Sequence, residues 1–192
     1  LSKHTRALGL RGFKDYCVLV ASPEGAAARR EMLSHLTTNF TRFFRENHHF
    51  EALASYMLPE AMRRNAGSRR LRIWSAGCST GEEAYCVAMA AADVVPAAGW
   101  DFKVLATDID SEVIAFAQQG VYPLDRVAAL PSERLRSCFQ KGTGVQVGKA
   151  IVKAHLRSLV TFRVLNLLQT WPMHGPFDVI LCRNVMIYFD QP

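Results

Sequence analysis

The spacing of apolar residues changes near residue 70. Upstream, apolar side chains recur at helical intervals, as they do over residues 13–20, and this pattern predicts helices across residues 1–36. Downstream, short apolar runs alternate with longer segments of helical periodicity, which is typical of an α/β domain. A polar link, Ala-Gly-Ser-Arg-Arg, joins the two parts. We therefore expect a basic helical domain over residues 1–66 and an α/β domain over residues 71–192.

The α/β part begins with LRIWSAGCSTGEE at residues 71–83. Its apolar start predicts a strand, its small residues predict a tight turn over Gly77–Gly81, and the apolar segment that follows predicts a helix. This is the layout of the first unit of a nucleotide-binding fold, in which glycines let a ligand approach the backbone. Glu82 and Glu83 open the helix, where they suit its dipole but would repel a pyrophosphate. The turn therefore favours a ligand with a cationic or hydroxyl-rich part.

Further strands and helices follow the turn. Residues 101–110 and 160–166 are predicted strands, and residues 177–183 form the near-continuous apolar run of a strand buried on both faces. Residues 111–119 are predicted to form a helix capped by Ser111. Because strands alternate with helices, we expect parallel pairing with right-handed crossovers.

Glycines interrupt this pattern between residues 139 and 157. Gly142, Gly144 and Gly148 stand beside a short apolar stretch in this segment. Such punctuation is typical of short strands joined by tight turns. We therefore expect a small antiparallel β-subdomain inserted at about residues 139–157.

Composition limits the class of protein. The chain has 192 residues, 49% hydrophobic and 21% charged, which is enough for one sizeable core and a small appendage. No apolar run reaches the ~18 residues of a membrane-spanning helix, so membrane insertion is not expected. The chain starts at Leu1 and stops at Pro192, soon after a strongly apolar segment. We expect it to be truncated at both ends.

The cysteines favour a reducing compartment. Their number is odd, no Cys-x-x-Cys pair occurs, and most stand in apolar surroundings. We interpret them as reduced, mostly buried thiols of a cytoplasmic protein, and we expect no metal site. The five are Cys17, Cys78, Cys86, Cys138 and Cys182.

The net charge of +6 is concentrated in the first third of the chain. Residues 1–72 carry 13 Lys and Arg against 6 Asp and Glu, a net charge of +7, and the remainder carries 10 against 11. A basic surface of this kind suits nucleic acid, an anionic membrane surface or an acidic protein substrate. A solvated helical surface with no partner is the simpler alternative.

The candidate chemistry lies at the carboxyl ends of the predicted strands, where open α/β sheets bind ligands. Asp108 stands about 30 residues beyond the first strand, where a carboxylate can accept hydrogen bonds from ribose hydroxyls. Dinucleotide dehydrogenases and S-adenosylmethionine-dependent methyltransferases share this feature, and Asp108 could instead cap the next helix. The turn GCSTGEE lacks the G-x-G-x-x-G spacing of dehydrogenases, and its Glu83 can meet an ammonium group.

Six motifs together resemble the CheR-type chemotaxis receptor glutamate methyltransferases. They are LTTNFTRFFRENHHF (36–50), WSAGCSTGEEAY (74–85), ATDIDSEVI (106–114), FQKGTG (139–144), VLNLL (164–168) and GPFDVILCRNVMIYFDQ (175–191). They cover much of the chain in the family's order. The resemblance implies a class I S-adenosylmethionine-dependent methyltransferase fold, Rossmann-like, with an N-terminal helical domain and an inserted β-subdomain. One departure is Gly77-Cys78, where some members have alanines; another is the absence of the family's first helices and last strands.

The resemblance also implies the site. S-adenosylmethionine would be the cofactor and S-adenosylhomocysteine its product. Arg45 and Tyr188 match the positions expected to act in methyl transfer, with Tyr188 near the reacting methyl group. The residues implied to bind the cofactor are Asn39, Thr41, Arg45, Gly77, Glu83, Asp108, Asn166, Leu167, Arg183 and Asn184.

The implied partners are methyl-accepting chemotaxis receptors. Their cytoplasmic methylation helices are rich in glutamate, so the basic first third would dock them. In some members the β-subdomain also binds a C-terminal receptor peptide by strand addition. The neighbouring histidines His48 and His49 complete no acid–base or metal cluster in the sequence, so structural or surface roles are expected for them.

Two alternatives differ in class. A nucleic-acid methyltransferase would share the fold, but Arg183-Asn184-Val185-Met186 replaces the Asn/Asp-Pro-Pro-aromatic motif of amino-group base methylation, and no Pro-Cys pair occurs. No nucleic-acid partner is therefore expected. A cofactor-binding regulatory or scaffold module without transfer activity would retain the same pocket residues.

Overall fold

The computed structural model describes residue 5, residues 9–36 and residues 39–189. The helices are α2 (Phe13–Ala21), α3 (Ala26–Leu36), α4 (His48–Ala52), α5 (Leu58–Arg64), α6 (Glu82–Ala92), α7 (Ser111–Gln119), α8 (Leu124–Val127), α9 (Ser132–Cys138) and α10 (Ala154–Arg157). A π-helical turn η2 (Leu53–Met57) joins α4 to α5, and 3₁₀ turns are η1 (Pro23–Gly25), η3 (Gly144–Gln146) and η4 (Met186–Tyr188). The strands are β1 (Arg70–Ala76), β2 (Asp101–Asp108), β3 (Val121–Pro123), β4 (Phe139–Lys141), β5 (Lys149–Val152), β6 (Val160–Val164) and β7 (Val179–Leu181).

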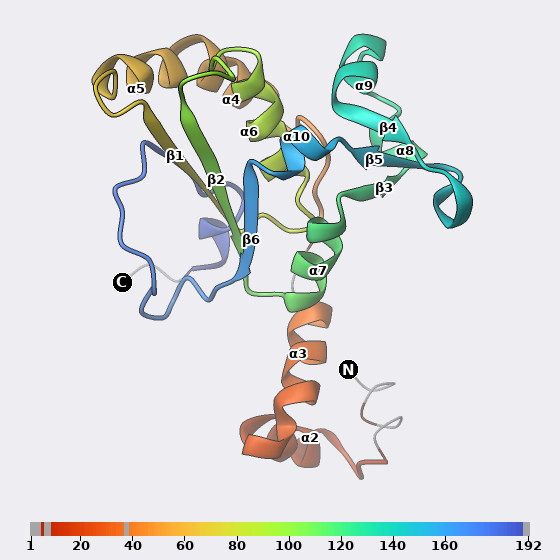
Figure 1. The fold of residues 1–192 in the computed structure, drawn as a ribbon. Helices are drawn as coiled ribbons and strands as arrows, with labels where there is room; N and C mark the ends of the chain where they lie inside the picture. The colour runs from red at the N-terminus through yellow and green to blue at the C-terminus, as the bar shows by residue number, and fades with distance from the viewer. Residues whose placement is uncertain (1–4, 6–8, 37–38, 190–192) are drawn as a thin grey trace.

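The main sheet has four parallel strands in the order β6-β2-β1-β7. β1 and β2 pair along their whole length, with Trp74 opposite Leu105 and Ala76 opposite Thr107. The parallel pairing confirms the expectation from the alternating strands and helices. It also brings the carboxyl ends of β1, β2, β6 and β7 to one edge of the sheet, as Figure 1 shows for β1, β2 and β6.

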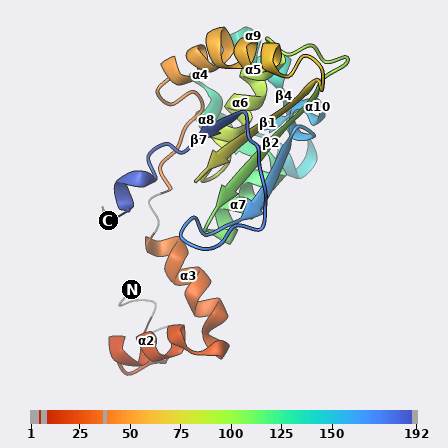
Figure 2. The ribbon, with the colours of Figure 1, turned by 90° about the vertical axis from the view of Figure 1, so that its left-hand side faces the viewer.

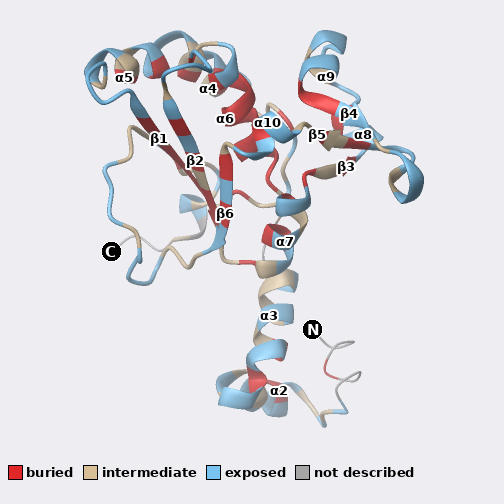
Figure 3. Cartoon of the chain, in the orientation of Figure 1, coloured by how far each residue is buried: buried red, intermediate tan, exposed pale blue. Residues whose placement is uncertain are grey.

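Helix α6 is the centre of the core. Its residues Ala84–Ala91 are all buried, because the sheet lies on one side of the helix and α4 and η2 pack against it on another. A helix that is apolar around its circumference is stable only when it is covered in this way. The buried positions therefore gather in α6 and in the strands beside it (Figure 3).

Helices α4 and α5 belong to the same core. Phe50, Leu53, Leu58 and Ala61 are buried in one cluster with the residues of β1 and α6, and α5 contacts β1 directly. The sequence places these helices in a separate domain that ends at residue 66, because a polar link follows them. We propose instead that the sheet-containing unit begins before α4.

A second sheet, β3-β5-β4, is antiparallel and stands beside the main sheet (Figure 1). Its strands β4 and β5 fall within the segment 139–157, but the sheet begins earlier, at Val121. The sequence does not reveal β3, because a three-residue strand ending in Pro123 shows no periodicity.

Helices α2 and α3 lie apart from the sheets (Figures 1 and 2). The end of α3 reaches α7, where the Ser34 hydroxyl donates to the Glu112 carboxylate over 3.2 Å. Within the described residues, no helix is long and apolar enough to cross a bilayer.

Candidate active site

The turn between β1 and α6 is fixed from two directions. The N–H groups of Gly77 and Cys78 donate to the Thr107 carbonyl of β2 over 2.8 and 2.9 Å. Gly77 has a φ of 78°, and a Cβ there would lie 2.2 Å from Cγ2 of Val185, which follows β7. Glycine is needed because the backbone is left-handed and the approach is close. The turn thus joins the ends of three strands.

Asp108 ends β2 and is bound to the turn. Its Oδ2 accepts the Ser79 N–H over 2.8 Å and its Oδ1 accepts the Asp110 N–H over 3.0 Å. Burial raises the pKa of Asp108, and these backbone donors oppose the rise. Asp108 therefore does not cap α7. The predicted cap Ser111 is also wrong, since Asp110 caps the helix by accepting the Glu112 N–H over 2.8 Å.

The two acids that open α6 point to different places. Glu83 accepts the Ser75 hydroxyl over 2.8 Å and Nη1 of Arg183 over 3.1 Å, and burial raises its pKa against both of these contacts. Glu82 is fully buried and pairs with Nη1 of Arg126 from α8 over 2.5 Å. Glu83 thus lines the cavity, whereas Glu82 binds α8, the helix that follows β3, to the turn between β1 and α6.

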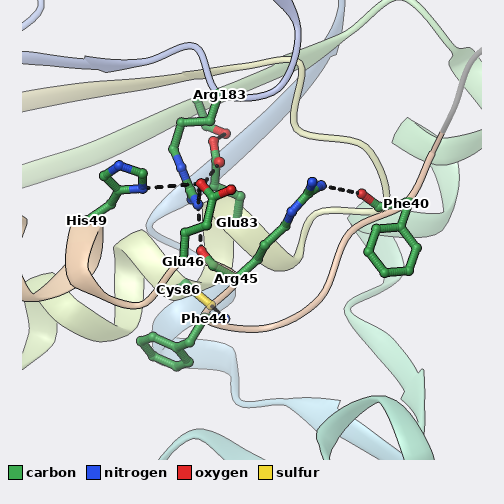
Figure 4. Close-up of polar contacts among 9 residues, drawn as sticks. Phe40, Phe44, Arg45, Glu46, His49, Glu83, Cys86 and Arg183 are labelled. Atoms are coloured by element: carbon green, nitrogen blue, oxygen red, sulfur yellow. Dashed lines mark hydrogen bonds and ion pairs between the residues drawn. The ribbon is translucent and has the colours of Figure 1, made fainter.

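Arg183, which follows β7, connects this edge to the segment before α4 (Figure 4). Its Nη2 donates to the Arg45 carbonyl over 2.5 Å and to the Glu46 carboxylate over 2.9 Å. Its guanidinium carbon lies 5.2 Å from the centre of the Phe50 ring. Side chains 137 residues apart in the sequence therefore meet here.

Residues 39–45 cover the turn from the other side. The Asn39 amide donates to the Asp110 carboxylate over 3.1 Å, and the Asn39 carbonyl accepts the Ser79 hydroxyl over 3.2 Å. The Arg45 guanidinium donates to the Phe40 carbonyl over 2.8 Å and lies over the Phe40 ring (Figure 4). This segment and the strand ends are two walls of one site.

Between these walls lies a cavity of about 500 Å³. It is lined by every residue that the sequence assigned to the cofactor: Asn39, Thr41, Arg45, Gly77, Glu83, Asp108, Asn166, Leu167, Arg183 and Asn184. Their separate roles toward the cofactor stay predictions. Tyr188 belongs to η4, between the lining residues Ile187 and Phe189, and its side chain is outside the described part of the chain.

The apolar lining of the cavity was not among the residues predicted from the sequence. Phe40, Ile109, Leu165, Val185 and Ile187 also face the cavity. Each is adjacent in the sequence to a predicted polar site residue, so this adjacency was the available signal. An apolar lining with a few convergent polar groups is typical of small-molecule sites, and the volume lies in their usual range.

The polar groups fit S-adenosylmethionine. Carboxylates at Asp108 and Glu83 suit ribose hydroxyls and an ammonium group, and the cations of Arg45 and Arg183 suit a carboxylate. Nε of Arg183 is buried and, among the described residues, has no acceptor, so a donor is left over at this end of the cavity. The described residues contain no group of three or more His, Cys, Asp or Glu that could hold a metal ion.

Comparison with known proteins identifies the family. Residues 39–192 match the family model for the CheR methyltransferase, SAM binding domain. The chain belongs to this family. The resemblance predicted from the six motifs is confirmed, and so is the class I methyltransferase fold, with its parallel sheet. As a CheR methyltransferase, the protein is an S-adenosylmethionine-dependent enzyme.

Members of the CheR family match along the whole chain. It is 51% identical to a probable chemotaxis protein methyltransferase of Rhizobium etli over 193 residues, covering 100% of this chain and 72% of that protein. It is 44% identical to chemotaxis protein methyltransferase 2 of Pseudomonas aeruginosa and 43% identical to the chemotaxis protein methyltransferase of Escherichia coli. Both matches cover 100% of this chain, which spans 67% of the Pseudomonas aeruginosa protein and 65% of the Escherichia coli protein.

Proposed function

We propose that this protein transfers a methyl group from S-adenosylmethionine to glutamate side chains of chemotaxis receptors, forming methyl esters. Three relatives whose matches cover the whole chain are named chemotaxis protein methyltransferases, the first of them as probable. The observation that carries the proposal is the cavity in which Asp108, Glu83 and the two arginines converge at the strand ends.

The acceptor chemistry matches the residues present. A glutamate side chain has a pKa of about 4.3 and is ionised at neutral pH, so no strong general base is required. Bound S-adenosylmethionine supplies an electrophilic methyl group on a sulfonium. With the cofactor held by Asp108 and Glu83, the acceptor carboxylate would take this methyl group, and sulfur would keep the electrons of the broken carbon–sulfur bond. The site must align these atoms and exclude water.

Arg45 and Tyr188 are the proposed catalytic residues. Arg45 lines the cavity and can either orient the substrate carboxylate or bind the carboxylate of the cofactor. Tyr188 can donate a hydrogen bond to the attacking carboxylate. Asp108 would hold the ribose hydroxyls, Glu83 the ammonium group, and Asn166 with Leu167 the adenine.

The proposed partners are the cytoplasmic methylation helices of the receptors, and the cytoplasm is the proposed compartment of the enzyme. The basic residues of the first third would attract these acidic helices. The antiparallel sheet β3-β5-β4 offers a strand edge that could take a C-terminal receptor peptide.

The test is transfer of labelled methyl groups to receptor-containing membranes. We expect base-labile label on the receptor, and loss of that label when the receptor's methylation-site glutamates are replaced by alanine. Arg45→Ala and Asp108→Ala should abolish labelling. Tight binding of S-adenosylhomocysteine without any label would instead identify a cofactor-binding regulatory module.

A further inference from the structure

The backbone is left-handed at two of the three residues 44–46, which lead from the cavity wall at residues 39–45 toward α4. Phe44 has a φ of 52° and Glu46 a φ of 55°, with Arg45 between them. Residues other than glycine adopt this conformation at a cost, so they keep it only where their surroundings hold them. Phe44 is held by its N–H, which donates to Sγ of Cys86 over 3.0 Å, and by its ring, 5.3 Å from that of Phe50.

Glu46 is held by the groups of the site itself. Its carboxylate accepts Nη2 of Arg183 over 2.9 Å, and the side chains of Arg183 and Asn184 lower the pKa of Glu46. The neighbouring His49 has its Nδ1 3.5 Å from the same carboxylate. Burial and the charge of Arg183 lower the pKa of His49, so the charged partner of Glu46 at neutral pH is Arg183.

The backbone carbonyl and the guanidinium of Arg45 point in different directions from the left-handed turn at residues 44–46 (Figure 4). Its carbonyl accepts Nη2 of Arg183 over 2.5 Å, while its guanidinium reaches the Phe40 carbonyl and faces the cavity. Arg183 therefore binds the Glu46 carboxylate and the Arg45 carbonyl together, at the base of the side chain that faces the cavity.

Glu46 also divides the hydrogen bonds of Arg183 between two carboxylates. Nη2 donates a hydrogen bond to Glu46, and Nη1 donates one to Glu83. An arginine can bind one carboxylate through two parallel hydrogen bonds, and such a pair is stronger than a single contact. Without Glu46, Arg183 would be able to turn both N–H groups to Glu83 and withdraw that carboxylate from a cationic ligand.

We propose that Glu46 is a positioning residue for the amino-acid end of the cofactor. It binds Arg183, which also holds the Arg45 carbonyl, and it leaves Glu83 with a lone pair and charge for the ligand's ammonium group. Its own carboxylate does not line the cavity. The inference concerns S-adenosylmethionine binding, and only its consequence for turnover rests on the proposed function.

The test compares two ligands that differ only at this end. S-adenosylhomocysteine carries the amino-acid part, and methylthioadenosine lacks it. In titration calorimetry, Glu46→Gln should weaken S-adenosylhomocysteine binding by roughly 10- to 100-fold and leave methylthioadenosine binding unchanged, because only the amino-acid end loses its alignment. Glu46→Asp, which keeps the charge, should recover part of the loss.

Two further variants separate charge from backbone strain. Glu46→Gly relieves the left-handed conformation but removes the carboxylate, so it should lose S-adenosylhomocysteine affinity as Glu46→Gln does. Glu60→Gln is the matched control, since Glu60 pairs with Arg63 over 2.8 Å on the surface of α5 and should leave both ligands unaffected.

Equal weakening of both ligands by Glu46→Gln, no weakening of either, or full S-adenosylhomocysteine affinity in Glu46→Gly would each overturn the inference. Absence of receptor methylation by an unmodified chain that binds S-adenosylhomocysteine would refute the proposed function and leave this inference intact.

Discussion

One added carbon atom would change the turn between β1 and α6. Gly77→Ala places a Cβ 2.2 Å from Cγ2 of Val185, at a φ of 78°. We expect it to lower the free energy of unfolding by about 2–4 kcal/mol, from left-handed strain plus displacement of Val185. Urea denaturation measures this change, and binding of S-adenosylhomocysteine should weaken in parallel.

Gly144 is the matched control for Gly77. It also has a positive φ, 56°, but nothing lies within 4 Å of an added Cβ. Gly144→Ala should therefore cost only about 1–2 kcal/mol of strain. Equal losses at both positions would show that the contact with Val185 contributes nothing.

Glu83 should make stability depend on pH. Burial raises the pKa of Glu83 above its ordinary value of 4.5, so the folded state favours the protonated side chain. The resulting contribution to the free energy of unfolding is fully present below pH 4.5 and is lost as the pH rises through the folded-state pKa. The uncharged Glu83→Gln variant avoids this loss. Relative to the unmodified chain, its free energy of unfolding should increase between about pH 5 and about pH 7.5.

Urea denaturation of both proteins at the two pH values provides the measurement. Glu133→Gln, at an exposed position of α9, is the comparison and should show no similar trend. A constant difference between Glu83→Gln and the unmodified chain would contradict the direction of the pKa shift. Because Glu83 is proposed to bind the ammonium group, the variant should also lose affinity for S-adenosylhomocysteine.

The contact between α8 and the first turn of α6 joins the two sheets. Glu82 has no exposed surface, and its carboxylate is bound by Arg126 of α8 and by the Thr80 hydroxyl. Tyr122 of β3 adds a hydrogen bond to the Thr80 carbonyl over 2.7 Å. The second sheet therefore supports the turn that lines the cavity.

Arg126→Ala should leave the Glu82 carboxylate buried without its charged partner. We expect a loss of about 3 kcal/mol in the free energy of unfolding, at the lower end for a buried pair because Arg126 is 39% exposed. The double variant Glu82→Gln with Arg126→Ala should recover much of this loss. If the two substitutions were additive in urea denaturation, the pair would not be coupled.

The uneven distribution of charge over the chain predicts that association with the proposed receptor substrates depends on salt. The net charge of +7 over residues 1–72 should attract glutamate-rich helices over a distance that salt shortens. Raising NaCl from about 0.05 to about 0.5 M should lower kcat/KM for the receptor by roughly 10-fold or more. The affinity for S-adenosylhomocysteine, measured in the same buffers, should change much less. Rates that do not respond to salt would argue against electrostatic docking.

Local apolar spacing predicted the longer elements of the α/β part, although it did not reveal the three-residue strand β3. The predicted helix 111–119 and strands near β1, β2 and β6 agree with the structure, because burial of one face imposes a period that the residues themselves display. The same pattern predicts the edge of the sheet where ligands bind, since parallel strands end together. This is why Gly77, Asp108, Asn166 and Arg183 line one cavity, whereas Asn39, Thr41 and Arg45 were assigned from the family resemblance.

Long-range packing determined which charge meets which partner. Glu82 and Glu83 are adjacent and chemically alike, yet one faces Arg126 and the other Arg183, 100 residues away. The left-handed backbone at Phe44 and Glu46 could not be predicted from the sequence, because neither residue is a glycine. Contacts with Cys86 and Arg183 hold this conformation in place. The sequence thus determined the family, the sheet and the members of the site. Their pairing required the folded chain, because a hydrogen bond depends on positions set by residues far away in the sequence.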